Sequence, residues 1–152
     1  MGKRRFVVAG TGTRATYSWV DPMLNQYADQ VDLVGLYDVN PGRARACNAI
    51  VKGAVPVYED FDGMLRAARP DALLVASTDA THAGYVVRGL EAGLEVYCEK
   101  PLCTTEEQVR AIRAAAARAP GRAWVTHNAR FLPAAQTIRR EIQAGRIGRL
   151  LH

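Results

Sequence analysis

The fold is decided by residues 6–15, which read FVVAGTGTRA. Four apolar residues, as in a buried strand, run into a Gly-x-Gly-x-x-Ala turn, and a helical stretch follows. Gly10 permits a sharp turn out of the strand, and Gly12 leaves the backbone without a Cβ where a diphosphate would approach. Ala15 is small enough to lie where the helix meets the strand. The stretch is either a dinucleotide-binding loop or an ordinary glycine-rich turn, and the rest of the chain decides between them.

The helix after this turn can bind an anion at its N-terminus. The first backbone N–H groups of a helix have no intrahelical partner, and the positive end of the helix dipole favours negative charge. The side chains of Thr11, Thr13 and Arg14 can add donors. We therefore predict Gly10, Gly12, Thr13 and Arg14 as cofactor-binding residues.

The composition excludes several classes of protein. The chain has 152 residues, of which 49% are hydrophobic and 23% charged, as expected for one soluble globular domain. The net charge of +5 comes from arginines scattered along the chain, whereas a nucleic-acid interface would cluster them. The apolar run after the basic start is only one strand long, which argues against a signal peptide or a membrane segment. We expect a cytoplasmic protein with neither nucleic-acid nor membrane partners.

The cysteines indicate neither a disulfide framework nor a metal centre. Cys47, Cys98 and Cys103 are odd in number and lack paired metal-ligand spacing. We therefore expect reduced thiols and no metal site.

Short apolar runs alternate with longer amphipathic runs, which predicts a parallel sheet with crossover helices. The expected strands are residues 6–9, 31–37, 56–58, 72–76, 94–98 and 124–127. Further helices are expected at residues 41–51, 61–68, 82–92, 104–119 and 133–144. The helix entered at Thr13 is expected in two short pieces, because Asp21 can cap a new helix and Pro22 suits its first turn. The predicted fold class is α/β, a Rossmann-type doubly wound, mainly parallel sheet with helices on both faces in three layers.

Asp38 follows the second expected strand, residues 31–37. In a Rossmann unit an acid at this place lies beside the glycine-rich turn and can accept hydrogen bonds from both ribose hydroxyls of the adenosine. Its offset from Gly10 is longer than the usual ~20 residues, which an interrupted helix would accommodate. The carboxylate would repel a 2′-phosphate, so we predict NAD rather than NADP, although Arg43 nearby argues the other way. A capping or turn role for Asp38 is the alternative.

The most apolar strand, residues 72–76, opens into a polar cluster that begins with Ser77 and Thr78. Ligands of an open parallel sheet lie at the carboxyl ends of its strands, so both side chains are predicted to face the cofactor. Thr81 is expected to cap the next helix, with His82 in its first turn. We predict that His82 belongs to the same site and orders its loop by hydrogen bonding.

The next strand, residues 94–98, runs directly into Glu99-Lys100-Pro101. With the motifs before and after it, this sequence resembles the N-terminal domain of the Gfo/Idh/MocA group, named after glucose-fructose oxidoreductase and inositol dehydrogenase. The motifs that carry the resemblance are the Gly10 turn, Asp38, Ser77-Thr78 with His82, Ala92-Gly93, Glu99-Lys100-Pro101, residues 128–133 (NARFLP) and residues 145–148 (GRIG). One departure is Asp79-Ala80, where the family often has Pro or Asn near the ribose.

The resemblance implies that Glu99, Lys100 and Asn128 join the cofactor site and that Lys100 is catalytic, working with an acid-base residue of a following domain. The residues themselves are consistent with this role. A lysine at the end of a central strand, fixed by a following proline, lies on rigid backbone, and its ammonium can polarise a hydroxyl or carbonyl. The alternative is a surface lysine in a tight turn. His127, at the end of the sixth strand, is expected to pack there rather than to contact substrate.

The resemblance also predicts the organisation of the protein. Residues 1–148 are expected to form a dinucleotide-binding domain, and residues 149–152 to begin a C-terminal α/β substrate domain that lies beyond this chain. The expected function is the cofactor domain of an NAD-dependent oxidoreductase for a CH-OH group of a sugar or polyol, homo-oligomeric at full length and inactive as this chain alone. Two alternatives remain open: a glycosidase that uses NAD for transient oxidation, and a nucleotide-binding module without catalysis.

Overall fold

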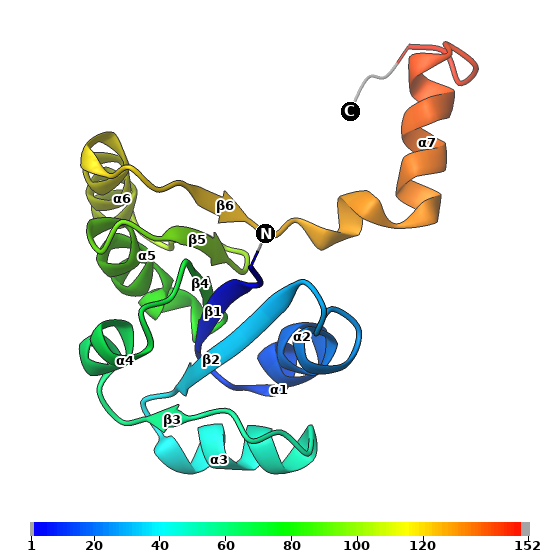
Figure 1. The fold of residues 1–152 in the computed structure, drawn as a ribbon. Coiled ribbons are helices and arrows are strands. Elements are labelled where there is room, and N and C mark those ends of the chain that lie inside the picture. The colour runs from blue at the N-terminus through cyan, green and yellow to red at the C-terminus, as the bar shows by residue number, and fades with distance from the viewer. Residues whose placement is uncertain (1, 150–152) are drawn as a thin grey trace.

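A computed structural model describes residues 2–149, and its strands form one parallel sheet (Figure 1). The strands are β1 Arg4–Ala9, β2 Val31–Tyr37, β3 Val57–Tyr58, β4 Ala72–Val75, β5 Glu95–Cys98 and β6 Ala123–Val125. Their order across the sheet is β3-β2-β1-β4-β5-β6, and every neighbouring pair is parallel. The strand order reverses between β1 and β4, as in dinucleotide-binding folds. The predicted fold class is confirmed.

Helices cover both faces of the sheet (Figure 1). The longer ones are α3 Pro41–Ile50, α4 Phe61–Ala68, α5 His82–Glu91, α6 Glu106–Arg118 and α7 Pro133–Gln143, and the shorter ones are α1 Thr13–Ala15, the π-helix Thr16–Val20, α2 Asp21–Asn25, and the 3-10 turns Asp79–Thr81 and Asn128–Phe131. Alternating residues of each strand face opposite layers. Val7 packs in a core cluster with residues of α4, α5 and α6, whereas Val8 packs in a second cluster with residues of α1, α2 and α3. This alternation produces the three layers.

The first helix differs from its prediction. The residues from Thr16 to Asp21 keep helical backbone angles, so α1, the π-helical turn and α2 follow one another without a capped break. Asp21 does not cap α2. Its carboxylate instead accepts a hydrogen bond from Asn25 Nδ2 at 2.7 Å, one turn further along the helix. The predicted interruption is therefore a wider π turn over Thr16–Val20.

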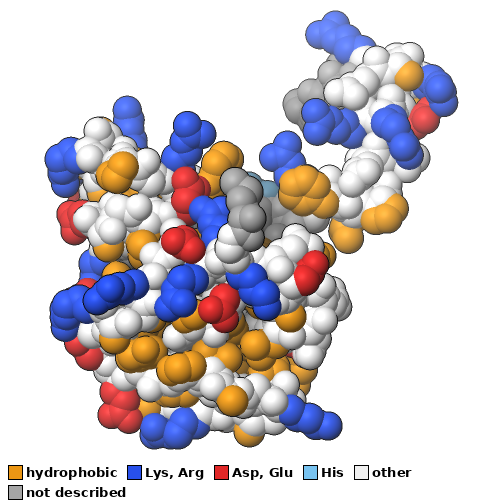
Figure 2. Space-filling view, viewed as in Figure 1, with side chains coloured by type: hydrophobic (Ala, Val, Ile, Leu, Met, Phe, Trp, Pro, Cys, Tyr) orange, Lys and Arg blue, Asp and Glu red, His pale blue; other side chains and the backbone are white. Residues whose placement is uncertain are grey.

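The last helix, α7, projects away from the sheet and its covering helices (Figure 1). No residue of α7 is buried, and hydrophobic side chains are visible on this projecting segment in Figure 2. Leu132 and Ile138 are 57% and 56% exposed. The apolar side of α7 thus has no covering element within residues 2–149.

Two further features bear on the expected surroundings of the protein. Across the described residues, none of the helices is both long and apolar enough to span a membrane. Cys47, Cys98 and Cys103 are free thiols, the first two of them buried.

Candidate functional site

The glycine-rich loop lies at the carboxyl edge of the sheet, between β1 and β4. Gly10 has a φ of +90°, and a Cβ added there would lie 2.4 Å from the Cα of Ser77. Position 10 therefore requires glycine for two reasons: the backbone conformation disfavours a side chain, and the neighbouring loop leaves no room for a Cβ. Its amide donates to Tyr37 O at 2.8 Å, which joins the loop to the end of β2 as well.

Gly12 has a different role in the same loop. A Cβ added at Gly12 would meet nothing within 4 Å, so the space above it is open. The amide of Thr16 makes the first bond within the helix, to Gly12 O at 2.9 Å. The amides of Thr13 and Arg14 precede that bond and can donate to an anion. The open space and the amides beside it fit a diphosphate, in agreement with the predicted role of the loop.

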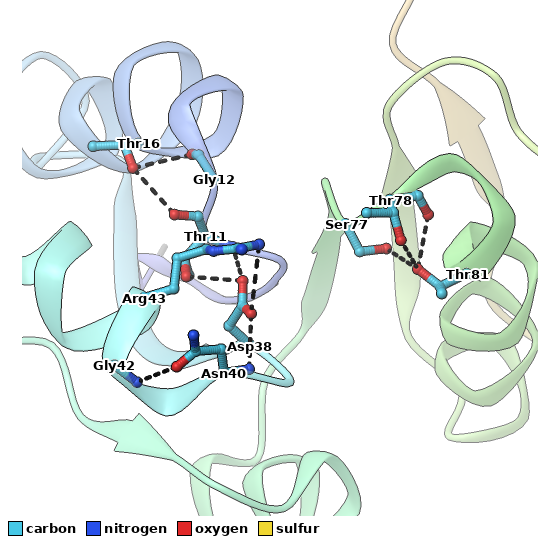
Figure 3. Close-up of polar contacts among 10 residues, drawn as sticks. All are labelled: Thr11, Gly12, Thr16, Asp38, Asn40, Gly42, Arg43, Ser77, Thr78 and Thr81. Carbon is cyan, nitrogen blue, oxygen red and sulfur yellow. Dashed lines mark hydrogen bonds and ion pairs between the residues drawn. The ribbon is translucent and has the colours of Figure 1, made fainter.

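Asp38 is buried at the end of β2, where it is 4% exposed. Its Oδ2 accepts hydrogen bonds from the amide and the hydroxyl of Thr11, at 2.9 and 3.2 Å, and its Oδ1 accepts from the amide of Asn40 at 3.0 Å (Figure 3). The guanidinium of Arg43 lies 4.0 Å from Oδ1. Asp38 therefore fulfils the alternative role of a turn residue, and it also lines the cavity beside Gly12, where contact with a ribose stays a prediction.

Ser77 and Thr78 face this cavity from the loop after β4. The hydroxyl of Thr81 lies 2.8 Å from that of Ser77 and donates to Thr78 O at 2.7 Å (Figure 3). Thr81 was expected to cap α5, but its hydroxyl is used within the preceding 3-10 turn and makes no capping bond. The cavity has a volume of about 250 Å³, and its walls include Gly10, Gly12, Thr13, Arg14, Asp38, Arg43, Ser77, Thr78 and Tyr85.

A larger cavity of about 710 Å³ adjoins the first, because Arg14 and Ser77 line both. Its walls also include Asp79, His82, Glu99, Lys100, Thr126, His127, Asn128 and Arg130. Lys100 is exposed here, in the turn that follows β5. His127 is exposed in the same cavity, so the expectation that it packs at the strand end is wrong.

Glu99 is a buried carboxylate, 4% exposed, that joins three elements. Its Oε1 accepts hydrogen bonds from Arg14 Nε and from Trp19 Nε1, both at 2.9 Å. Burial alone would raise the pKa of the Glu99 carboxyl, but the bonds from Trp19 and Arg14, the Arg14 charge and the Lys100 amide lower it below its usual value. The Glu99 side chain is thus an ionised carboxylate beside Lys100. Its hydrogen bond from Arg14 links it to the cavity beside the glycine-rich loop.

Asn128 lies at the start of the 3-10 turn after β6. With its amide oriented so that the oxygen faces Arg14, Asn128 accepts from Arg14 Nη2 and donates to Thr126 O at 3.2 Å. The Arg14 side chain also donates to Ser18 Oγ at 3.1 Å. Arg14 therefore joins its own helix to the ends of β5 and β6, which the sequence could not show.

His82 is 1% exposed, and both of its ring nitrogens contact backbone carbonyls. Nδ1 lies 2.6 Å from Pro101 O, and Nε2 lies 3.1 Å from Ser77 O. The loop-ordering role predicted for His82 agrees with these contacts. Because its ring nitrogens face protein carbonyls, His82 acts on the cavities through the two loops that it joins.

Two residues of this region were not predicted as site residues. Trp19 bonds Glu99 from the π turn, and Tyr85 lines the smaller cavity. Helical spacing offers a signal for Tyr85 alone, since it lies three residues after His82 and so on the same face of α5. The contact of Trp19 spans 80 positions of the chain and leaves no local pattern.

Comparison with known proteins assigns the chain to a family. The family described as "Oxidoreductase family, NAD-binding Rossmann fold", GFO_IDH_MocA, matches residues 4–127. The chain belongs to this family. The predicted family and the predicted cofactor, NAD, are both confirmed, and the chain contains the NAD-binding Rossmann domain of the Gfo/Idh/MocA family.

Similar Gfo/Idh/MocA proteins are known by sequence and by structure. YteT of Bacillus subtilis, named as an oxidoreductase, is 30% identical over 151 residues, which cover 97% of this chain and 35% of YteT. Inositol 2-dehydrogenase 2 of Saccharopolyspora erythraea is 37% identical over 115 residues, which cover 75% of this chain and 34% of that enzyme. The chain thus spans 35% and 34% of these two relatives. The WlbA dehydrogenase from Bordetella pertussis, solved with NADH and UDP-GlcNAcA, is similar with a TM-score of 0.87 and 27% identity, over 97% of this chain and 44% of WlbA.

Proposed function

We propose that this chain serves as the cofactor domain of an NAD-dependent dehydrogenase that oxidises a CH-OH group of a sugar, a polyol or a related compound. The position of Lys100 carries the proposal. Lys100 lines the larger cavity, which shares the wall residues Arg14 and Ser77 with the cavity beside the glycine loop. The proposed nucleotide site, beside the glycine loop, and the proposed catalytic site, at Lys100, therefore lie next to each other at one edge of the sheet.

The residues of this chain divide the work of binding and chemistry. The amides of Thr13 and Arg14 would hold the diphosphate, and Asp38 the adenosine ribose. Bound NAD would supply the hydride acceptor. The Lys100 ammonium would donate a hydrogen bond to the substrate oxygen and stabilise the negative charge that develops there as its proton leaves. We propose that the base that takes this proton belongs to a domain following this one.

The substrate class rests on the relatives. One is an inositol 2-dehydrogenase, and WlbA was solved with UDP-GlcNAcA, so both support a polyhydroxylated substrate. Cations of the larger cavity, among them Lys100 and Arg130, can donate hydrogen bonds to the several oxygens of such a molecule.

We further propose that residues 1–148 form the cofactor domain and that residues 149–152 begin a substrate domain; residues 150–152 lie outside the described part of the chain. The exposed apolar side chains of Leu132 and Ile138 support a covering domain. We propose a homo-oligomer for the longer protein. A cytoplasmic location is consistent with the three free cysteines, since a reducing compartment keeps thiols from forming disulfides.

The preference for NAD over NADP is also a proposal. The buried carboxylate of Asp38 would repel a 2′-phosphate, and Arg43, at 4.0 Å from it, would attract one. Asp38 neutralises part of the Arg43 charge, and its own burial strengthens its effect on a ligand in the cavity. We therefore expect NAD to bind more tightly.

Calorimetric titration with NADH tests this proposal. Gly12→Val places a side chain in the open space beside the Thr13 amide, so we expect a folded variant that binds NADH far more weakly. Gly84→Val is the matched control, because its Cβ on α5 also meets nothing within 4 Å and lies away from the glycine loop. Equal NADH affinity in wild type and Gly12→Val would contradict the assignment.

A further inference from the structure

Lys100 is flanked by two residues that side chains from distant elements hold in place. The preceding residue, Glu99, accepts bonds from Arg14 and Trp19, both at 2.9 Å. The carbonyl of the following residue, Pro101, lies 2.6 Å from His82 Nδ1. The turn that carries Lys100 is therefore held by hydrogen bonds on both sides. The inference drawn below rests on the proposed function of Lys100.

Trp19 holds the turn from the β1 side of the sheet. It is half-buried in the π turn Thr16–Val20, a kind of turn that is often found at functional sites. Its indole N–H is a donor only, and the buried Glu99 carboxylate is an acceptor with few other partners. This charge-assisted bond fixes the direction of the Glu99 side chain and hence of the backbone that leads into Lys100.

His82 holds the same turn from the β4 side. A carbonyl oxygen can only accept, so a hydrogen bond at the shorter of the two contacts, 2.6 Å to Pro101 O, requires the ring proton on His82 Nδ1. The ring is 1% exposed and its other nitrogen contacts Ser77 O, which leaves it little freedom to rotate. His82 thus joins the loop that faces the smaller cavity to the turn that presents Lys100 to the larger one.

We propose that Trp19 and His82 are positioning residues for Lys100, which direct its ammonium into the larger cavity by fixing the residues on either side of it. Neither residue touches the reacting atoms in this arrangement. Trp19 acts through Glu99, and His82 acts through Pro101.

The lysine content of the chain allows a direct test. The sequence has lysine only at Lys3, Lys52 and Lys100. All three are exposed, but of the three only Lys100 lines the larger cavity and follows the buried Glu99. Reductive methylation with ¹³C-formaldehyde therefore gives few NMR signals, and Lys100→Arg assigns the one from Lys100. We expect this signal to be displaced from those of Lys3 and Lys52 in the intact chain, without any cofactor, because Lys100 lies among the charged side chains of the larger cavity.

Trp19→Phe removes the indole donor and keeps an aromatic ring, so the Lys100 signal should move to the position of the Lys3 and Lys52 signals. Trp124→Phe is the matched control, because Trp124 Nε1 also donates to a glutamate of β5, Glu95, at 2.8 Å, but on the exposed surface. That control should leave the Lys100 signal unchanged. A purely structural role of Trp19 would lower the melting temperature and leave the Lys100 signal where it is.

The His82 contact is tested by substitution and rescue. His82→Leu should abolish the distinct Lys100 signal, whereas His82→Asn, whose amide nitrogen can take the place of Nδ1, should restore it. If His82→Leu does not fold, the comparison of Trp19→Phe with Trp124→Phe alone tests the proposal. A Lys100 signal that is the same in wild type and folded Trp19→Phe overturns the proposal. Since these spectra need no NADH, their result is independent of whether the proposed cofactor role is correct.

Discussion

Gly10→Ala is expected to destabilise the fold, because the new side chain would meet the backbone of the neighbouring loop. The added Cβ would lie 2.4 Å from both N and Cα of Ser77 and 2.6 Å from Ala76 C. These are backbone atoms that cannot rotate away, so the loops after β1 and β4 would have to separate. The φ of +90° adds backbone strain for any residue with a Cβ.

The size of this effect can be worked out from those contacts. The left-handed conformation costs about 1–2 kcal/mol, and forcing an extra methyl group into a packed interior costs about 1–3 kcal/mol more. The free energy of unfolding should fall by about 2–5 kcal/mol, a large part of the 5–15 kcal/mol that is typical of a domain. At about 2–4 °C per kcal/mol for a chain of this size, the melting temperature should fall by roughly 4–20 °C.

Gly12→Ala in the same loop is the matched comparison. Gly12 has a φ of −68° and open space where a Cβ would lie, so its replacement should leave stability unchanged or raise it by about 0.4–1 kcal/mol. Its NADH affinity should nevertheless fall. Thermal unfolding followed by circular dichroism gives the first quantity and calorimetry the second. A Gly10→Ala variant that melts with the wild type would refute the reasoning.

Three other predictions concern charged residues of the site. Asp38→Ala should narrow the affinity difference between NAD and NADP in competition titrations, and a wild type that already prefers NADP would rule out the role given to Asp38. In the longer protein that we propose, Lys100→Ala should lower turnover by roughly 10²-fold with little change in NAD affinity, as for the loss of a positioned polarising group; normal turnover in a stable variant removes Lys100 from the chemistry. Because the pKa of Glu99 is lowered in the folded state, its ionised form stabilises the fold above the ordinary value of 4.5, and this stabilisation is lost as the pH falls through the lowered pKa. The melting-temperature difference between wild type and Glu99→Gln should therefore shrink in acid, and a difference independent of pH would contradict this.

The parts of the fold that were predictable are those with a local pattern. The alternation of apolar strands with amphipathic helices indicated the parallel sheet, and the rule that ligands lie at the carboxyl ends of its strands brought Gly12, Asp38, Ser77 and Lys100 to one edge. The structure places all four on the two adjoining cavities. Each of these residues follows directly after a strand or lies in the first turn, so its place depends on the topology more than on side-chain packing.

The parts that were not predictable depend on contacts between distant residues. Asp21 and Thr81 have the residue types of helix caps, but the backbone around Asp21 stays helical and the Thr81 hydroxyl bonds within its own turn. Capping propensity is a small local preference, and tertiary packing overrides it. The bond from Trp19 to Glu99 spans 80 positions, and the burial of Glu99 that makes it effective is a property of the assembled sheet.

The central claim is that this edge of the sheet binds NAD, and amide NMR of the ¹⁵N-labelled chain during an NADH titration tests it most directly. The largest shifts are predicted for the amides of Gly12, Thr13 and Arg14, followed by those of Ser77 and Lys100 across the two cavities. Shifts confined to residues elsewhere, or saturation without any change at Gly12 and Thr13, would contradict the account.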